Sequence, residues 1–79
     1  MKQTTIALST VNDVKRFVSA ALKYPYEIDL ITGRYAVDGK SILGILSFLS
    51  MKPAQPIILE AHTDNPSALL CDIQEFLVE

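Results

Sequence analysis

The chain has 79 residues, of which 49% are hydrophobic and 20% are charged, and its formal net charge is −2 at pH 7. This length is sufficient for one domain with a small core, so we expect residues 1–79 to form a single domain. The slight acidic excess and the scattered lysines and arginines exclude the basic patch that nucleic-acid binding requires.

The sequence also bears on the cellular compartment. Its N-terminal residues lack the apolar stretch of a signal peptide, and no apolar run approaches the ~20 residues needed to span a bilayer. The single cysteine, Cys71, excludes an intrachain disulfide, so the small core is not cross-linked. These features predict a cytoplasmic protein that does not enter a membrane.

The first third of the chain predicts a strand, a helix and a second strand. Residues 2–8 are rich in β-branched side chains, which favour a strand. Residues 11–23 change to a helical period with one apolar stripe. Thr10 is placed to cap this helix, and Asp13, three residues later, gives a variant of the capping box. The alternation of apolar and polar residues over 26–31 predicts the second strand.

The middle of the chain predicts a hairpin and a short helix. Thr32 and Gly33 have the composition of a hairpin turn, and residues 34–37 are expected to form the returning strand. Ser41 is placed to cap a helix over 42–49. Four apolar residues of this helix share one face: Ile42, Ile45, Leu46 and Leu49.

The last third predicts a loop, a strand and a helix. Residues 52–56 contain two prolines and predict a rigid loop, and 57–62 predict a strand whose alternate residues face the core. Those core-facing residues are Ile57, Leu59 and Ala61. Pro66 is expected at the first position of the last helix, where its missing N–H costs no hydrogen bond. The apolar stripe of this helix consists of Leu69, Ile73, Phe76 and Leu77.

The expected order of elements is therefore βαββαβα, which assigns the chain to the α+β class. One sheet of four strands and three helices packs most economically as two layers, with the three helices on one face. The hairpin and the helical connection after the first strand favour an antiparallel sheet.

We find no pattern typical of a metal site, a cofactor site or an enzyme. His62 and Cys71 are the only histidine and the only cysteine, and they lie on different predicted elements without ligand spacing. We therefore predict a solvated His62 at a strand end and a packed Cys71 thiol. A triad of Ser67, His62 and Asp64 has no visible oxyanion device to support it. Five carboxylates are expected on solvated faces: Glu27, Asp29, Asp72, Glu75 and Glu79.

One segment differs from the rest. The run from Asp38 to Ser47 (DGKSILGILS) places Ser41 at a helix N-terminus with apolar residues just behind it. The helix dipole and the free backbone N–H groups favour an anion there, so a phosphoserine at this position would be well placed. The simpler interpretation is that Ser41 is an N-cap that contributes about 1 kcal/mol.

The segment from Lys40 to Ser47 (KSILGILS) resembles the regulatory serine segment of HPr, the histidine-containing phosphocarrier of the bacterial sugar phosphotransferase system. The similarity is to the form found in Gram-positive bacteria of low G+C content. Phe17 and Val18 in the first helix are in register with this family, without a gap up to Ser41. The resemblance covers essentially the whole chain and implies the HPr-like open-faced β-sandwich of four strands and three helices.

The chain departs from this family at the phosphocarrier site. In HPr a Gly-Leu-His-x-Arg-Pro-Ala motif opens the first helix, and its histidine carries the phosphoryl group. Residues 8–14 of this chain are LSTVNDV, so Thr10 takes the position of the histidine, Asn12 that of the arginine and Asp13 that of the proline. A threonine lacks the nucleophilicity of imidazole, and a carboxylate repels an incoming phosphoryl group. We therefore predict that the carrier site is lost and that the chain has no catalytic residue.

Family members that lack the histidine and keep the serine act only in regulation, and the resemblance implies this role here. Ser41 would accept phosphate from HPr kinase/phosphorylase, and the partner would be a transcriptional regulator or a phosphotransferase-system protein in carbon catabolite control. We expect a monomer or a weak dimer that is not an enzyme and holds no metal or cofactor. The residues expected to form the docking patch are Lys40, Ile42, Leu43, Ile45 and Leu46.

Two alternatives remain open at this point. In the first, the chain is a degenerate HPr fold that binds a protein without phosphorylation, and Ser41 is only a helix cap. In the second, residual phosphotransfer passes through Thr10.

Overall fold

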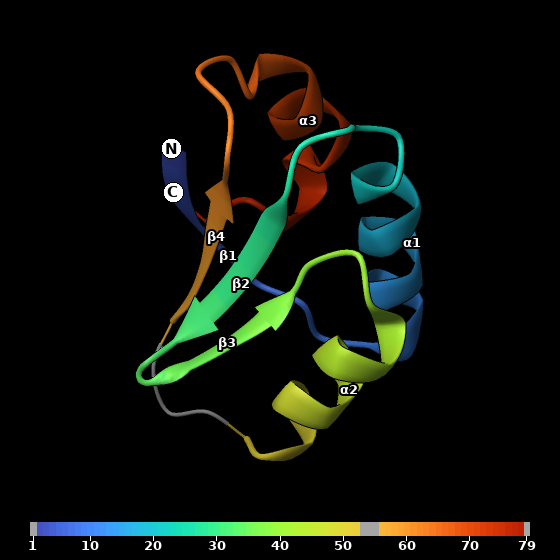
Figure 1. The fold of residues 1–79 in the computed structure, drawn as a ribbon. Helices are drawn as coiled ribbons and strands as arrows, with labels where there is room; N and C mark the ends of the chain where they lie inside the picture. The colour runs from blue at the N-terminus through green and yellow to red at the C-terminus, as the bar shows by residue number, and fades with distance from the viewer. Residues whose placement is uncertain (1, 53–55, 79) are drawn as a thin grey trace.

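A computed structural model describes residues 2–52 and 56–78 of the chain (Figure 1). It has the expected element order and confirms the α+β class and the open-faced sandwich layout. The elements are β1 (Lys2–Ile6), α1 (Val11–Ala21), β2 (Ile28–Thr32), β3 (Tyr35–Asp38), α2 (Ile42–Ser50), β4 (Ile57–Ala61), α3 (Ser67–Asp72) and a final 3-10 turn (Gln74–Phe76).

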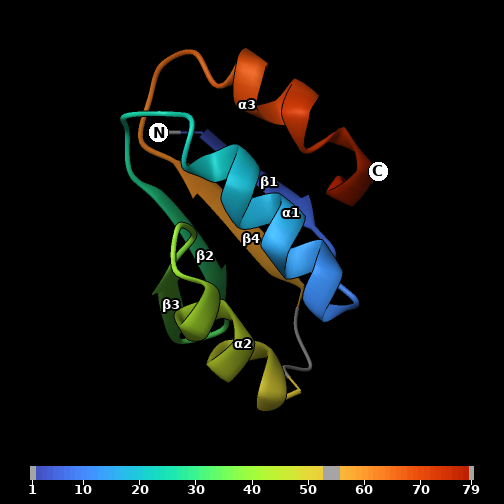
Figure 2. The ribbon, with the colours of Figure 1, turned by 90° about the vertical axis from the view of Figure 1, so that its right-hand side faces the viewer.

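The four strands form one antiparallel sheet in the order β1-β4-β2-β3. The central pair is β2 with β4, in which Leu30 lies opposite Leu59. All three helices lie in front of one face of this sheet when the molecule is turned as in Figure 2. In the described part of the chain the other face carries no helix, and the β2 and β4 residues on that face are half-buried.

Alternate strand residues build the floor of the core, as the sequence predicts. Ile28 and Leu30 of β2 are buried, and so are all three residues of β4 that were expected to face inward. The helices add three aromatic side chains, of which Phe17 of α1 and Phe76 meet edge to face at 6.3 Å between ring centroids. Phe48 of α2 is the third and is 1% exposed.

The first helix begins as predicted and ends earlier. Thr10 is the N-cap, and the predicted capping box with Asp13 is present. The helix ends at Ala21 rather than at residue 23. The backbone N–H groups of Lys23 and Tyr24 then donate to carbonyls three residues back, which tightens the chain into a turn before the following proline.

The hairpin is shifted along the chain relative to the prediction. Strand β2 begins at Ile28 and includes Thr32, which pairs with Tyr35 and is buried. The two-residue turn is therefore Gly33-Arg34 rather than Thr32-Gly33. Gly33 has a φ of 54°, a conformation that glycine adopts without the steric penalty of a Cβ atom.

The last helix is shorter than its apolar stripe suggests. Pro66 is the N-cap of α3 rather than its first residue, and α3 ends at Asp72. Ile73 leaves helical geometry at φ −108° and ψ 20°, and a 3-10 turn carries Phe76 back into the core. The predicted loop over 52–56 lies partly outside the described residues.

The segment after α3 runs along the outer edge of β1. Ile6 and Leu77 form an isolated antiparallel bridge. The Ala7 N–H donates to the Phe76 carbonyl at 2.9 Å, and the Val78 N–H donates to the Thr5 carbonyl at 3.0 Å. The end of the described chain thus satisfies backbone groups that an edge strand would otherwise expose.

Over residues 2–52 and 56–78, the helices are too short and insufficiently apolar for any of them to cross a lipid bilayer.

The burial pattern of α2 generates a stability prediction. Phe48→Ala removes a buried ring, and we expect a loss of about 3–5 kcal/mol in the free energy of unfolding. Leu43→Ala, on the same helix, removes a side chain that is 79% exposed, so we expect a change within about 0.5 kcal/mol. Urea unfolding followed by far-UV circular dichroism measures both. Equal losses for the two variants would contradict the observed orientation of α2.

Candidate functional site

The predicted serine site lies at the beginning of α2. Ser41 is the N-cap, as predicted, and its Oγ accepts a hydrogen bond from the Gly44 N–H at 3.0 Å. The chain before it is held by Asp38, whose carboxylate accepts the Lys40 N–H at 2.9 Å and whose carbonyl accepts the Ser41 N–H at 3.1 Å. Ser41 is half-buried.

The first turn of α2 has the electrostatic character of an anion site. It contains no acidic residue, so the partial positive charge of the helix N-terminus is not neutralised from within the helix. Leu43 is 79% exposed and Ile42 is 38% exposed, which leaves apolar surface directly beside Ser41.

The structure alters the predicted docking patch. Ile45 is 0% exposed, because it lies on the inner side of α2 and belongs to the core, so it is not available to a partner. Leu46 is half-buried and packs against the core. The Lys40 ammonium is half-buried and donates to the Tyr24 carbonyl at 2.6 Å. The freely exposed part of the patch is therefore Ile42 and Leu43.

Thr10, which the sequence analysis aligned with the phosphocarrier histidine, forms hydrogen bonds with neighbouring residues of the chain. Thr10 Oγ1 accepts the Asp13 N–H at 3.0 Å. The Asp13 carboxylate in turn accepts the backbone N–H of Ser9 at 2.9 Å and that of Thr10 at 3.3 Å. Arg16 donates to the same carboxylate at 2.7 Å. Asn12 is exposed and takes no part in these four hydrogen bonds.

The hydrogen bonds at Asp13 have an electrostatic consequence. The Ser9 N–H, with smaller contributions from Arg16 and Thr10, holds the pKa of the Asp13 carboxyl below its ordinary value of 3.8. A carboxylate that is ionised at neutral pH thus lies in the first turn of α1, whereas the first turn of α2 has no acidic residue and the Asp38 carboxylate lies before its cap.

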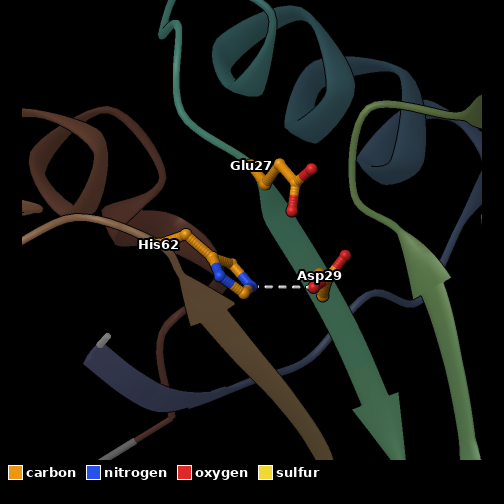
Figure 3. Close-up of side chains that lie close together, drawn as sticks. All are labelled: Glu27, Asp29 and His62. Carbon is orange, nitrogen blue, oxygen red and sulfur yellow. Dashed lines mark hydrogen bonds and ion pairs between the residues drawn. The ribbon is translucent and has the colours of Figure 1, made fainter.

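A cluster that the sequence did not predict lies on the open face of the sheet. In Glu27, Asp29 and His62, the carboxylate oxygens and the ring nitrogen that could bind a metal all lie within 4.8 Å of one another. Figure 3 shows the three side chains. The His62 Nε2 atom is 2.8 Å from Asp29 Oδ2 and 3.4 Å from Glu60 Oε1. His62 is therefore half-buried and paired rather than simply solvated at a strand end, and Asp29 is not a free surface carboxylate.

This cluster was missed because the sequence separation of its members is large. Residues 27 and 62 become neighbours only when β2 pairs with β4, and these strands are not consecutive in the chain. The available signal was the alternation of apolar and polar residues in both strands, which places Glu27, Asp29, Glu60 and His62 on the face opposite the core.

Two other carboxylates also have specific partners. Tyr24 donates its hydroxyl to Asp72 at 2.5 Å, and the Lys23 ammonium lies 3.8 Å from the same carboxylate. Glu75 forms an ion pair with Arg16 at 2.9 Å. These contacts join the region around α1 to α3 and the 3-10 turn, and both carboxylates lie on exposed faces, as predicted.

The remaining candidates do not assemble into a reactive site. Cys71 is exposed, not packed, because α3 turns this position away from the core. Ser67 and Asp64 form no hydrogen bond with His62 in the described part of the chain, and the His62 ring is directed at Asp29 instead.

Comparison with protein-family models and with curated protein sequences finds no match to this chain.

The Asp13 network predicts a pH-dependent contribution to stability. Because the folded-state pKa of Asp13 is lowered, its carboxylate stabilises the fold above the ordinary value of 3.8, and this contribution is lost as the pH falls through the folded-state pKa. We expect Asp13→Asn to unfold at lower urea concentration than the wild type at neutral pH. The difference should shrink in acid. Asp64→Asn, at an exposed carboxylate, is the control, and a deficit that is constant with pH would contradict the assignment.

A second pH prediction concerns Tyr24. The hydrogen bond to Asp72, helped by burial and by the charge of that carboxylate, raises the pKa of Tyr24 from its ordinary value of 10.0 to about 12. The fold thus favours the neutral phenol, and this stabilisation is present below pH 10.0 and is lost as the pH rises through about 12.

The chain has three tyrosines and no tryptophan, so phenolate absorbance reports their titration directly. We expect Tyr24→Phe to remove the titration step near pH 12 and Asp72→Asn to lower the pKa of Tyr24, with circular dichroism following the fold. An unchanged titration in Asp72→Asn would disprove the role of the hydrogen bond.

Proposed function

We propose that this chain is an HPr-like regulatory domain, not an enzyme, that offers the first turn of α2 to a partner protein and is switched by phosphorylation of Ser41. The observation that carries the proposal is the contrast between the two helix N-termini. The one at α1 holds the Asp13 carboxylate, and the one at α2 has no acidic group in its first turn.

The chemistry of a phosphoserine suits this position. A phosphate on Ser41 would bring a charge of about −1.5 to −2 to the positive end of the α2 dipole. It would also supply oxygens that accept the backbone N–H groups of the first turn, including that of Gly44, which the Ser41 hydroxyl accepts in the unmodified protein. Phosphorylation therefore replaces a neutral cap with a charged one.

The apolar surface next to Ser41 suits a protein partner. Ile42 and Leu43 are exposed large hydrophobic residues at consecutive positions, and such side chains contribute when a partner removes them from water. A phosphate beside them changes the charge of the surface that a partner meets. The resemblance names the partner classes: HPr kinase/phosphorylase as the modifying enzyme, and a transcriptional regulator or a phosphotransferase-system protein as the reader. We place the protein in the cytoplasm as a monomer or a weak dimer.

A second function is favoured by a different observation. The Ser41 hydroxyl is half-buried and is already used as a cap, and the Lys40 ammonium is held by a backbone carbonyl. These contacts suit a binding module that is never phosphorylated, in which Ser41→Ala affects stability alone. Phosphotransfer through Thr10 has the least support, because its hydroxyl is engaged with Asp13 and a carboxylate lies beside it.

Incubation with HPr kinase and ATP, followed by intact mass measurement and peptide mapping, tests the proposal. We expect one added phosphate, lost in Ser41→Ala and retained in Ser47→Ala, which alters an exposed serine of the same helix. A control HPr is modified in the same tube. No phosphate on this chain, with the control modified, would reject the switch and favour the unphosphorylated binding module.

The two roles of Ser41 are separated by a stability measurement. We expect Ser41→Ala to lower the free energy of unfolding by about 1 kcal/mol and Ser41→Asp, which retains a capping acceptor, to preserve it. A partner that binds the wild type and Ser41→Ala equally well, but rejects the phosphorylated protein, supports regulation by charge. Equal binding to all three forms contradicts it.

A further inference from the structure

We propose that Glu27, Asp29 and His62 form a binding site for a divalent ion of the zinc type on the open face of the sheet. This site is independent of Ser41 and of the HPr resemblance. It is built entirely from β2, β4 and the residues that adjoin them.

Backbone pairing fixes the positions of the three ligands. Ile28 lies opposite Ala61 in the register of β2 and β4, and the His62 N–H donates to the Glu27 carbonyl at 2.9 Å, which extends the pairing by one residue. Glu27 and Asp29 are two residues apart, so their side chains leave the same face of the sheet. A rigid two-strand platform therefore holds the group.

The three side chains are also oriented toward a point where one metal ion could bind. Figure 3 shows the Nε2 edge of His62 turned toward Asp29, with Glu27 beside them. Zinc binds imidazole nitrogen and carboxylate oxygen at about 2.0–2.2 Å. The donor atoms lie within 4.8 Å of one another, so binding would require a small side-chain adjustment, and Glu27 is the exposed member of the set.

The charge balance of this face favours a cation. Glu27, Asp29 and Glu60 provide three carboxyl groups around one imidazole. The ion pairs that Arg16 and Lys23 form in the described part of the chain lie instead with Asp13, Asp72 and Glu75. Among the described residues, no lysine or arginine forms an ion pair with these carboxylates, so a divalent ion would compensate their charge.

Glu60 places a further carboxylate beside this site. One of its oxygens lies 3.4 Å from His62 Nε2, and the other accepts a hydrogen bond from Gln3 at 2.7 Å. Glu60 is therefore held from the β1 side of the sheet, next to the ligands. Because Glu60 approaches the same ring nitrogen that would bind the ion, it adds negative charge beside the site rather than a hydrogen bond to the other ring nitrogen.

The donor set selects the class of ion. Calcium and magnesium prefer oxygen ligands alone, whereas imidazole suits zinc and its transition-metal neighbours. Three protein ligands on a half-exposed surface leave the remaining coordination positions to water.

Isothermal titration with zinc chloride tests the site. The protein is used without an affinity tag and in a Cys71→Ser background, because an exposed thiol is a competing zinc ligand. We expect one ion per chain. His62→Gln and Asp29→Asn should each weaken binding by more than about tenfold, and Asp64→Asn, which removes an equal charge outside the cluster, should leave it unchanged.

The single histidine gives an independent readout. Its ring protons are the only histidine signals in the NMR spectrum, and we expect zinc to shift them while calcium does not. Far-UV circular dichroism establishes that each variant is folded. Absence of zinc binding to the folded protein, binding that survives His62→Gln, or calcium binding of equal affinity would overturn the proposal.

Discussion

The pairing of β2 with β4 is the contact on which the rest of the structure depends. It joins segments that are distant in the chain and places them at the centre of the sheet. Each strand is buried on one face, and the other face carries the pair Asp29 and Glu60 next to the pair Ile31 and Ile58. One register therefore aligns Leu30 with Leu59 under the helices and brings His62 beside Glu27 on the far side. A slip of one residue would exchange the two faces and destroy the core and the polar cluster together.

The N-termini of α1 and α2 differ in the groups that cap them. These are the two regions that the sequence analysis compared with HPr. At α1 the chain supplies its own anion, because the Asp13 carboxylate accepts N–H groups from Ser9 and Thr10. At α2 the cap is the neutral hydroxyl of Ser41. In both helices a neutral hydroxyl accepts the N–H group three residues further on, and α1 alone adds a carboxylate that accepts the N–H groups at and before its cap.

Local patterns predicted most of the fold. The capping box at Thr10, the cap at Ser41 and the alternation in β4 depend on neighbouring residues, and the structure confirms all three. Element ends were less accurate, because tertiary packing sets them: Thr32 joins β2 when it becomes buried, and α3 stops where Ile73 must turn Phe76 inward. The exposure of Cys71 and the burial of Ile45 likewise depend on how each short helix is rotated against the sheet.

The polar cluster could not be predicted from spacing, since its two halves are separated by 33 residues and meet only through long-range pairing. Asp72 illustrates the same limit, because its contact with Tyr24 crosses from α3 to the turn after α1. Contacts between residues so far apart in the sequence can be identified only when the strand order and the helix packing are known.

The segment after α3 restricts how these molecules can associate through their sheets. Because Phe76, Leu77 and Val78 cover part of the outer edge of β1, the opposite edge at β3 is the more accessible one for strand addition. A molecule with one accessible edge can pair with a second copy through that edge, about a twofold axis. Both accessible edges are then buried between the two copies. Growth into an open-ended fibre requires two free edges per molecule. Covering part of the β1 edge thus limits strand addition on that side of the sheet.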